Sequence, residues 1–466
     1  MKRTPIMIMG CTSDAGKSFL VTALCRHFAN RGLRVAPFKA QNMSNNAAVT
    51  PDGLEIGRAQ YLQASAARVV PQARMNPILL KPSADTQSQV IVMGKYDPVV
   101  TATPWLERKS LLWPVVRDAL NGLLREYDLV VIEGAGSPAE INLRESELVN
   151  MRIAIECGAD VYLVADIDRG GAFAHLLGTW MCLEPVERAL IRGFVLNKFR
   201  GDPKLLGNAM DWLRERTGVP TVAIIPYFRH HLPEEDTLHH RATVDTTKIN
   251  IALIAYPYAS NVDEFDPLVH EKGVNVVPIR DFTRLSDFHA IILPGSKNTA
   301  ASLRHLRETG LAAEVSRAAE RGTMILGVCG GMQLLGLRIA DPDNLEGGGN
   351  IAGLGLLDVT TTLKPHKITQ QREVRCVEGG VVRGYEIHHG HTQAGPKAKP
   401  HLEEGLGWWQ GNVVGVYLHG LLENTGYRQR FLSQLGWQSQ TRDWAASVDA
   451  EIERVAALIS ESGWTL

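Results

Sequence analysis

The chain has 466 residues, which at ~150 residues per domain suggests two or three domains. Hydrophobic residues make up 45% of the chain and charged residues 21%, so disorder and fibrous folds are excluded. Lysine and arginine number 49 against 50 aspartates and glutamates, which argues against a nucleic-acid partner and favours small molecules. The six scattered cysteines form no CxxC pair, which argues against a zinc site or a disulfide framework and favours a reducing compartment.

The N-terminal apolar stretch Ile6–Met9 is too short for a signal peptide or a membrane anchor, so we expect a buried first strand. No other run approaches the ~18 apolar residues that a membrane helix needs, and we expect a cytoplasmic protein without a membrane partner. Short apolar runs then alternate with amphipathic helical stretches, which predicts parallel α/β sheets. The predicted strands of the first half are Ile6–Met9, Val35–Phe38, Leu129–Ile132, Val161–Ala165, Gly193–Leu196 and Val222–Ile225.

The sequence GCTSDAGKS at residues 10–18 follows the first strand and precedes an apolar helical stretch. Such a strand–loop–helix binds phosphates, because glycines turn backbone N–H groups toward the anion and the helix N-terminus adds a favourable dipole. We expect Lys17 to neutralise the outer phosphates of ATP and the Ser18 hydroxyl to ligate Mg²⁺. Five residues rather than the usual four separate Gly10 from Gly16, and the alternative is a glycine-rich turn with an incidental lysine. The residues expected to bind the nucleotide are Gly10, Thr12, Ser13, Asp14, Ala15, Gly16, Lys17 and Ser18.

Three polar residues at the ends of other predicted strands are expected at the same edge of the sheet, where open α/β sheets bind their ligands. Lys39 ends the second strand and is expected to contact ATP, unless it is an ordinary solvated lysine. Glu133 follows the strand at 129–132 and is expected to contact Mg²⁺ directly or through water. Asn197 follows the strand at 193–196 and suits a hydrogen bond to a purine, with a turn asparagine as the alternative.

Residues 233–248 are polar, charged and without periodicity, and we interpret them as a linker. We therefore predict a P-loop-type parallel-sheet domain at 1–232, a second α/β domain at 249–436 and a helical tail at 437–466. The tail is expected to be amphipathic, because apolar residues recur at helical spacing from 444 to 459. The predicted strands of the second half are Ile249–Ala255, Val274–Val277, Ala290–Leu293 and Thr323–Val328, then antiparallel strands near Val374–Val377, Val381–Gly384 and Val413–Tyr417.

Cys329 lies in the sequence TMILGVCGGMQLLG, where an aliphatic strand runs into a glycine-rich turn and then a helix. This pattern is typical of a nucleophile elbow with cysteine in place of serine. The helix N-terminus favours the thiolate and backbone N–H groups can form an oxyanion hole, to which the segment at 293–297 is a further candidate contributor. His419, just past a strand, is the best-placed base among fifteen histidines. The alternatives are a buried structural cysteine and a satisfied core histidine.

The segment GYEIHHGHT at 384–392 holds His388, His389 and His391 within four residues. A metal tract is one interpretation. Because no cysteine or acidic ligand cluster accompanies it, we favour a substrate-contacting or interface loop.

Taken together, the sequence resembles the cobyric acid synthases over nearly its whole length. The first half is also similar to dethiobiotin synthetase in its longer phosphate loop, and the second half to class I glutamine amidotransferases. The stretches that carry the resemblance are GCTSDAGKS, VAPFKAQNMSNN, EIGRAQ, MNPILLKP, VIEGAGSPAEINL, DIDRGGAFA, LPGSKNT, GVCGGMQLLG, GYEIHHGHT and GVYLHG.

The resemblance implies that ATP and Mg²⁺ activate carboxylates of adenosylcobyrinic acid a,c-diamide, and that the b, d, e and g side chains are amidated in turn. It implies that glutamine is hydrolysed through a Cys329 thioester with His419 as base, and that the ammonia attacks the activated carboxylate. ATP, glutamine and a corrinoid acid are thus the implied small-molecule partners, with no permanently bound cofactor.

One position departs from the class I pattern, in which a glutamate stands two residues after the histidine. Leu421 occupies that position, so the group that orients His419 is missing or comes from elsewhere, with Glu423 as a candidate. Two rival functions remain open: cobyrinic acid a,c-diamide synthase, which amidates other carboxylates, and a non-enzymatic ATPase switch of the partitioning type. The Cys329 elbow argues against the switch.

Overall fold

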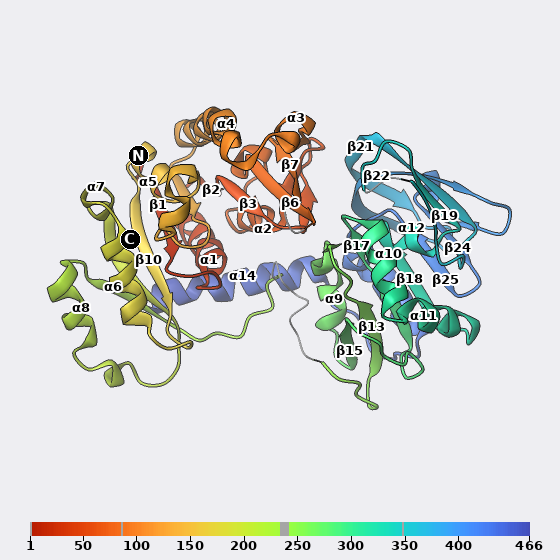
Figure 1. Cartoon of the computed structure of the whole chain (residues 1–466). Coiled ribbons are helices and arrows are strands. Elements are labelled where there is room, and N and C mark those ends of the chain that lie inside the picture. The colour runs from red at the N-terminus through yellow and green to blue at the C-terminus, as the bar shows by residue number, and fades with distance from the viewer. Residues whose placement is uncertain (1, 85–86, 234–241, 347–348) are drawn as a thin grey trace.

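The computed structural model describes residues 2–84, 87–233, 242–346 and 349–466. Two lobes lie side by side, the first half of the chain in one and most of the second half in the other (Figure 1). The linker expected at 233–248 falls largely on residues 234–241, which lie outside the described residues.

The first lobe is built on a six-stranded parallel sheet in the order β12-β11-β10-β1-β9-β2. Every strand predicted in the first half is confirmed. Such strands read as continuous apolar runs because helices cover both faces of a parallel sheet. The strands are β1 (Ile6–Gly10), β2 (Val35–Phe38), β9 (Leu129–Glu133), β10 (Asp160–Asp166), β11 (Ile191–Phe199) and β12 (Thr221–Pro226), and the helices are α1 (Lys17–Asn30), α2 (Arg58–Ala66), α3 (Pro98–Ala102), α4 (Trp105–Glu126), α5 (Met151–Cys157), α6 (Ala172–Cys182), α7 (Pro185–Arg188) and α8 (Ala209–Thr217).

Between β2 and α3 the chain forms a small additional sheet in the order β3-β6-β7-β8 and a two-stranded ribbon of β4 and β5. Sequence analysis predicted no strands here, because most of these elements are only two or three residues long and show no alternation. Their bounds are β3 (Gln41–Met43), β4 (Ala47–Val49), β5 (Glu55–Gly57), β6 (Ile78–Ala84), β7 (Gln87–Val92) and β8 (Lys95–Tyr96).

The second lobe contains a seven-stranded sheet in the order β15-β13-β16-β18-β25-β24-β23. The expectation of antiparallel pairing for Val413–Tyr417 was only half right, since β25 pairs parallel with β18 and antiparallel with β24. The large-sheet strands are β13 (Ile249–Ile254), β15 (Val274–Ile279), β16 (Ala290–Leu293), β18 (Met324–Val328), β23 (Lys399–Leu402), β24 (Gly407–Gln410) and β25 (Val413–Val416), and the helices are α9 (Asp266–Val269), α10 (Thr299–Glu308), α11 (Leu311–Glu320), α12 (Gly330–Leu335) and α13 (Thr425–Gln434).

A long antiparallel hairpin of β21 (Val359–Arg375) and β22 (Val381–Ala394) forms a further sheet with β19 (Arg338–Asp341) and β20 (Gly349–Ala352). The segment 384–392, expected to be a loop, lies within strand β22, because its residues pair in register with β21. A short ribbon of β14 (Ala259–Ser260) and β17 (Gly295–Ser296) completes the strands of the lobe.

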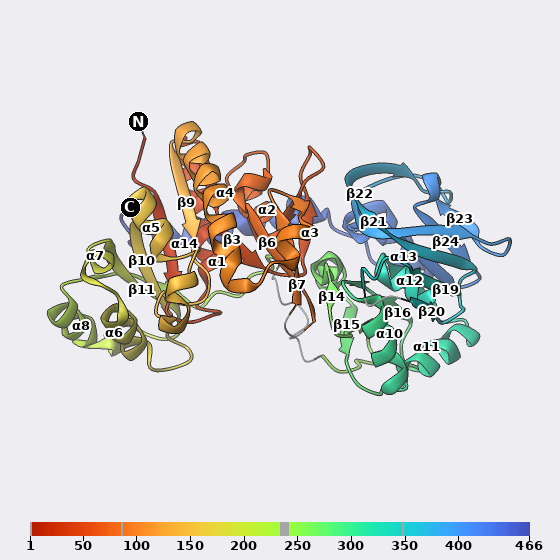
Figure 2. The ribbon, with the colours of Figure 1, turned by 45° about the horizontal axis from the view of Figure 1, so that its top comes forward.

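The predicted terminal helix is confirmed as α14 (Trp444–Glu461), and it leaves the second lobe to pack against α1 of the first (Figure 2). Its Val455 and Ile459 join an apolar cluster with residues of α1. Arg26 of α1, buried, pairs with Asp449 and Glu453 of α14 at 2.6 Å each. The C-terminal helix therefore connects the second lobe to the first.

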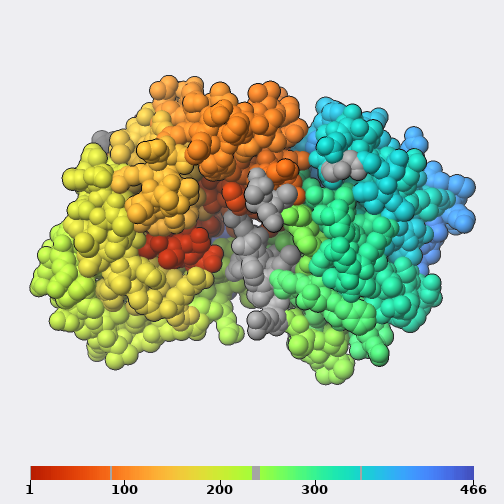
Figure 3. All heavy atoms as spheres, viewed as in Figure 1, coloured from red at the N-terminus to blue at the C-terminus, as the bar shows by residue number. Residues whose placement is uncertain are grey.

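The lobes meet directly, the elements drawn in orange touching those drawn in cyan (Figure 3). The hydrogen bonds that cross the interface include those from Ala47 N to Asn261 Oδ1 at 2.9 Å and from Val262 N to Asn46 Oδ1 at 3.3 Å. An apolar cluster spans it, formed by Ala47, Val49, Leu79 and Ile91 of the first lobe with Tyr385 and Ile387 of β22.

Candidate active sites

The glycine-rich loop after β1 has a backbone that only glycine permits at two positions. Gly16 has φ +93°, and a Cβ there would lie 2.1 Å from Nδ2 of Asn197. A Cβ on Gly10 would lie 2.6 Å from the Thr12 carbonyl oxygen and 2.9 Å from Nζ of Lys17. The loop is therefore folded tightly around the Lys17 ammonium, directly at the N-terminus of α1.

Lys17 lies buried across the loop and donates to the carbonyl oxygens of Thr12 at 3.3 Å and Gly136 at 3.2 Å. Burial lowers the pKa of the Lys17 ammonium, and the nearby Glu133 carboxylate opposes that shift. Gly136 follows β9, so the loop after β9 closes over the loop after β1.

Glu133, at the end of β9, collects three donors. Its Oε1 accepts from Ser18 Oγ and from Lys39 Nζ, each at 2.8 Å, and its Oε2 accepts from Gln63 Nε2 at 2.5 Å. Burial alone would raise the pKa of Glu133, but Lys39 and the three hydrogen bonds hold it below its usual range. The structure thus brings Ser18, Lys39 and Glu133 together as expected, and Lys39 is a buried partner of Glu133 rather than a solvated lysine. Sequence analysis missed Gln63, which has no motif around it.

Asn197 lies beside the same loop, where its Nδ2 donates to the Ala15 carbonyl oxygen at 2.8 Å. A contact of this residue with a purine stays a prediction. The next residue, Lys198, also missed from the sequence, donates to the Asp14 carbonyl oxygen and to Asp166 Oδ2, each at 2.8 Å. The ends of β10 and β11 therefore hold the phosphate loop in place.

Cys329 occupies a strained turn between β18 and α12, with φ 50° and ψ −107°. The flanking glycines allow this turn to pack closely. A Cβ on Gly331 would lie 1.9 Å from the Leu293 carbonyl oxygen, and a Cβ on Gly330 would lie 2.6 Å from the Ser296 backbone nitrogen. The geometry is that of a nucleophile elbow, and it sets the segment at 293–297 against Cys329 as expected.

His419 hydrogen-bonds with the Cys329 thiol, and its Nδ1 lies 2.8 Å from Oε1 of Glu264. The other oxygen of Glu264 accepts from the Gly420 backbone N–H at 2.9 Å. Burial opposes a charge on the imidazole, but Glu264 and Cys329 outweigh it and raise the pKa of His419 to about 10. His419 therefore carries a proton at neutral pH, and an imidazolium beside a cysteine favours the nucleophilic thiolate.

The group that orients His419 does come from elsewhere in the chain, but it is Glu264 and not the candidate Glu423. Glu264 comes from the turn after β14, about 150 residues earlier in the chain, so proximity in sequence pointed to the wrong carboxylate. The sequence feature that could have pointed to Glu264 is the cluster of three acidic residues in NVDEFD, residues 261–266.

Cys329 and His419 line a cavity of about 20 Å³, which is roughly the space of one water molecule. Its charged lining consists of Lys297, Glu346 and Lys81, the last of which comes from the first lobe. Lys81 is buried and paired with Glu55, which also accepts from Lys367 Nζ at 2.5 Å. The first lobe therefore contributes to the wall of the cysteine site.

Two of the three histidines of β22, His388 and His389, hydrogen-bond to neighbouring protein groups. His388 bonds to Glu386 Oε2 at 2.9 Å and to the Gly390 carbonyl oxygen at 2.8 Å, and its ring stacks on Tyr417. Burial, Lys297 and Lys367 lower the pKa of His389 to about 3. His388 and His389 line the cavity, and His389 also contacts Tyr96 of the first lobe, which agrees with a substrate-contacting or interface role.

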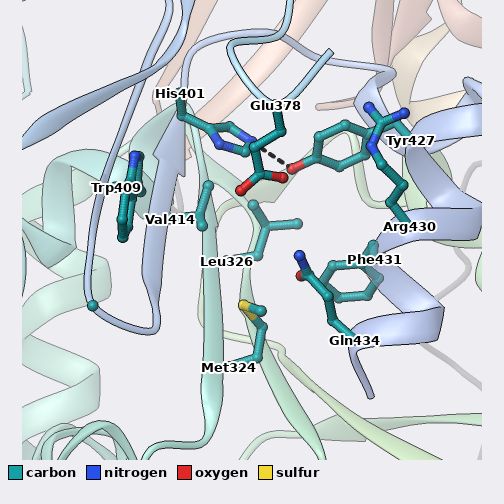
Figure 4. A pocket seen from close by; sticks show the side chains of 11 residues that line it. Met324, Leu326, Glu378, His401, Trp409, Val414, Tyr427, Arg430, Phe431 and Gln434 are labelled. Atoms are coloured by element: carbon teal, nitrogen blue, oxygen red, sulfur yellow. Dashed lines mark hydrogen bonds between the residues drawn. The ribbon is translucent and has the colours of Figure 1, made fainter. Parts of the chain in front are cut away.

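A larger cavity of about 200 Å³ lies between the sheet and α13 (Figure 4). Apolar residues such as Leu326 and Phe431 form its wall, and His401 Nε2 pairs there with the Tyr427 hydroxyl at 2.8 Å. None of the predicted site residues lines it. The chemistry therefore centres on the smaller cavity.

A phosphate loop in one lobe and a cysteine elbow with its histidine and glutamate in the other define an ATP-using enzyme with a glutamine amidotransferase domain. Family models agree: one described as a CobQ/CobB/MinD/ParA nucleotide binding domain matches residues 6–236, and one described as a CobB/CobQ-like glutamine amidotransferase domain matches residues 250–427.

Among curated proteins, the chain is 53% identical to the cobyric acid synthase of Deinococcus radiodurans, with 97% of each chain covered. It is 50% identical to that of a Polaromonas species over 91% of each chain and 52% identical to that of Paracidovorax citrulli over 90% of each. The chain belongs to the cobyric acid synthase family. It is an amidating ligase of cobalamin biosynthesis, and the nucleotide-binding domain fits ATP.

Among the residues that the structure describes, no helix is both long enough and apolar enough to cross a membrane.

Replacing Glu264 by glutamine tests the histidine's environment. Without the carboxylate, burial dominates and the pKa of His419 falls, so the imidazolium is lost at a lower pH than in the wild type. We expect kcat/KM for glutamine hydrolysis to fall on the order of 100-fold at pH 8 and its alkaline limb to move to lower pH. The measurement is a pH profile of glutamate release. An alkaline limb at the wild-type position would contradict the role of Glu264.

Proposed function

We propose that the chain converts adenosylcobyrinic acid a,c-diamide to adenosylcobyric acid by amidating its b, d, e and g carboxylates, with nitrogen from glutamine and energy from ATP. The observation that carries the proposal is the Cys329–His419–Glu264 arrangement in the same chain as the phosphate loop. The names of the full-length relatives support the choice of substrate. The glutaminase chemistry argues against a partitioning-type switch.

In the glutaminase reaction, the Cys329 sulfur attacks the carboxamide carbon of glutamine and forms a thioester. His419, held by Glu264, donates its proton to the departing nitrogen, which leaves as ammonia. Water then hydrolyses the thioester to glutamate, with His419 accepting a proton from the attacking water. Backbone N–H groups at the start of α12 stabilise the oxyanion.

The charges around the cavity suit an α-amino acid. Lys297 and Glu346 line the cavity and are placed to pair with the α-carboxylate and the α-ammonium of glutamine. Burial lowers the pKa of Lys297 and raises that of Glu346, so the opposite charges of the bound substrate would favour the charged form of each. A space of about 20 Å³ is too small for glutamine, so the cavity must widen before the substrate enters.

In the synthetase reaction, the residues of the loop 10–18 hold the phosphates of ATP, and Lys17 turns from its carbonyl partners toward the outer phosphates. A hydroxyl and an ionised carboxylate suit a hard cation, so Ser18 and Glu133 would hold Mg²⁺, which would neutralise charge on the phosphates. The substrate carboxylate attacks the γ-phosphorus to give an acyl phosphate and ADP. Ammonia then displaces phosphate and leaves the amide.

Mass spectrometry of corrinoid acids incubated with the protein, ATP, Mg²⁺ and glutamine tests the substrate. We expect the a,c-diamide to acquire four further amides, with one glutamate released for each. Consumption of cobyrinic acid with formation of only the a,c-diamide would instead identify the rival synthase. No glutamate release with either corrinoid and ATP present would overturn the proposal.

A further inference from the structure

Arg58 belongs to the first lobe by sequence but to the glutaminase site by its contacts. It is the first residue of α2, and its guanidinium reaches into the second lobe. Nε lies 2.7 Å from Asp263 Oδ2, and Nη2 donates to Glu423 Oε1 at 2.5 Å. The Arg58 side chain is 14% exposed and that of Asp263 is 1% exposed, so this ion pair is shielded from solvent, whereas the Glu423 side chain is 31% exposed.

The two carboxylates that Arg58 binds lie on the two turns that build the cysteine site. Asp263 directly precedes Glu264 in the 3₁₀ turn η5 (Val262–Phe265). Glu423 ends the 3₁₀ turn η7 (Leu421–Glu423), which begins two residues after His419. Arg58 therefore bridges the turn that carries the histidine's partner and the turn that follows the histidine.

The carboxylates that surround Arg58 need a positive charge beside them. Asp263, Glu264 and Glu423 are three carboxylates close enough to influence one another, and burial raises the pKa of Asp263 to about 6 while Arg58 opposes that shift. The ion pairs that the structure records for Asp263 and Glu423, among the described residues, are those with Arg58. Removing the guanidinium would leave uncompensated buried charge, and the two turns would relax apart.

The helix that supplies Arg58 is also fixed at the nucleotide site. Gln63, five residues further along α2, donates to Glu133 at 2.5 Å. One short helix thus contacts Glu133 near one end and the glutaminase turns at the other.

We propose that Arg58 is a positioning residue of the glutaminase reaction, supplied by the synthetase lobe, which holds the Glu264 turn against His419 by pairing with Asp263 and Glu423. The proposal rests on the proposed function of Cys329 and His419. It makes the glutaminase site incomplete without the first lobe.

The test compares full-length Arg58→Met and Arg58→Lys with the wild type in glutamate release across a pH series, with ATP, Mg²⁺ and the corrinoid present. We expect Arg58→Met to lower kcat for glutamine about 100-fold, the loss typical of a small misplacement of a catalytic group. Its alkaline limb should move to lower pH, because a His419 that loses Glu264 loses its proton more readily. The kcat of Arg58→Lys should lie between those of the wild type and Arg58→Met, since one ammonium lacks the planar guanidinium that contacts two carboxylates at once.

Gln371→Leu is the matched control, because Gln371 Nε2 donates across the same interface to the Val49 carbonyl oxygen at 2.8 Å without touching Asp263 or Glu423. This control should keep the wild-type pH profile, and ammonia-driven amidation should survive in all variants. An unmoved alkaline limb in both Arg58 variants would overturn the proposal and leave Arg58 a structural contact. Absence of glutamate release by the wild type would instead defeat the proposed function itself.

Discussion

Replacing Cys329 by serine should abolish amidation driven by glutamine while leaving amidation driven by ammonia. The serine oxygen lacks the nucleophilicity of a thiolate beside an imidazolium, so the thioester cannot form. We expect glutamate release to fall by on the order of 10³-fold or more. The synthetase site needs only ammonia, and added ammonium salt at alkaline pH should restore amide formation. Product amide and glutamate are measured in parallel.

Cys376→Ser is a suitable control, since Cys376 is also buried in the second lobe but lies at the β21–β23 contact rather than in the cavity. It should retain both activities. Loss of the ammonia-driven reaction in Cys329→Ser, with the protein still folded, would contradict the assignment of two separate reaction sites.

Much of the architecture could be predicted because buried parallel strands are local signals. The six strands of the first lobe, the β18–Cys329–α12 elbow and the terminal helix all follow from apolar runs and helical spacing. The strands between residues 41 and 96 could not, since they are short and are stabilised by pairing with one another and by contact with β22.

The site residues likewise divide into those that a local sequence pattern predicts and those that only the fold reveals. Lys17, Ser18 and Cys329 stand in local motifs that fix their backbone, and Glu133 follows from its place at a strand end. Glu264, Gln63 and Arg58 act on residues far away in the chain, and only the fold brings them together. Proximity in sequence even favoured Glu423, whose carboxylate the structure pairs with Arg58 instead.

Replacing Lys17 by methionine should impair amidation whether glutamine or ammonia supplies the nitrogen, unlike the change at Cys329. Lys17 carries the positive charge inside the phosphate loop, and its removal leaves the developing charge on the transferred phosphoryl group without its cation. We expect amidation to fall about 100- to 1000-fold with either nitrogen source, because no acyl phosphate forms. ADP release and amide formation are the measurements.

Lys95→Met, which changes an exposed lysine of the same lobe, should keep full activity. Comparing Cys329→Ser with Lys17→Met distinguishes the glutaminase reaction from the synthetase reaction. Cys329 is needed only to produce ammonia, so added ammonia rescues its loss. Lys17 is needed to form the acyl phosphate that ammonia attacks, so added ammonia cannot rescue the loss of Lys17. If ammonia restored amidation to Lys17→Met, the carboxylate would have to be activated elsewhere than at the loop 10–18.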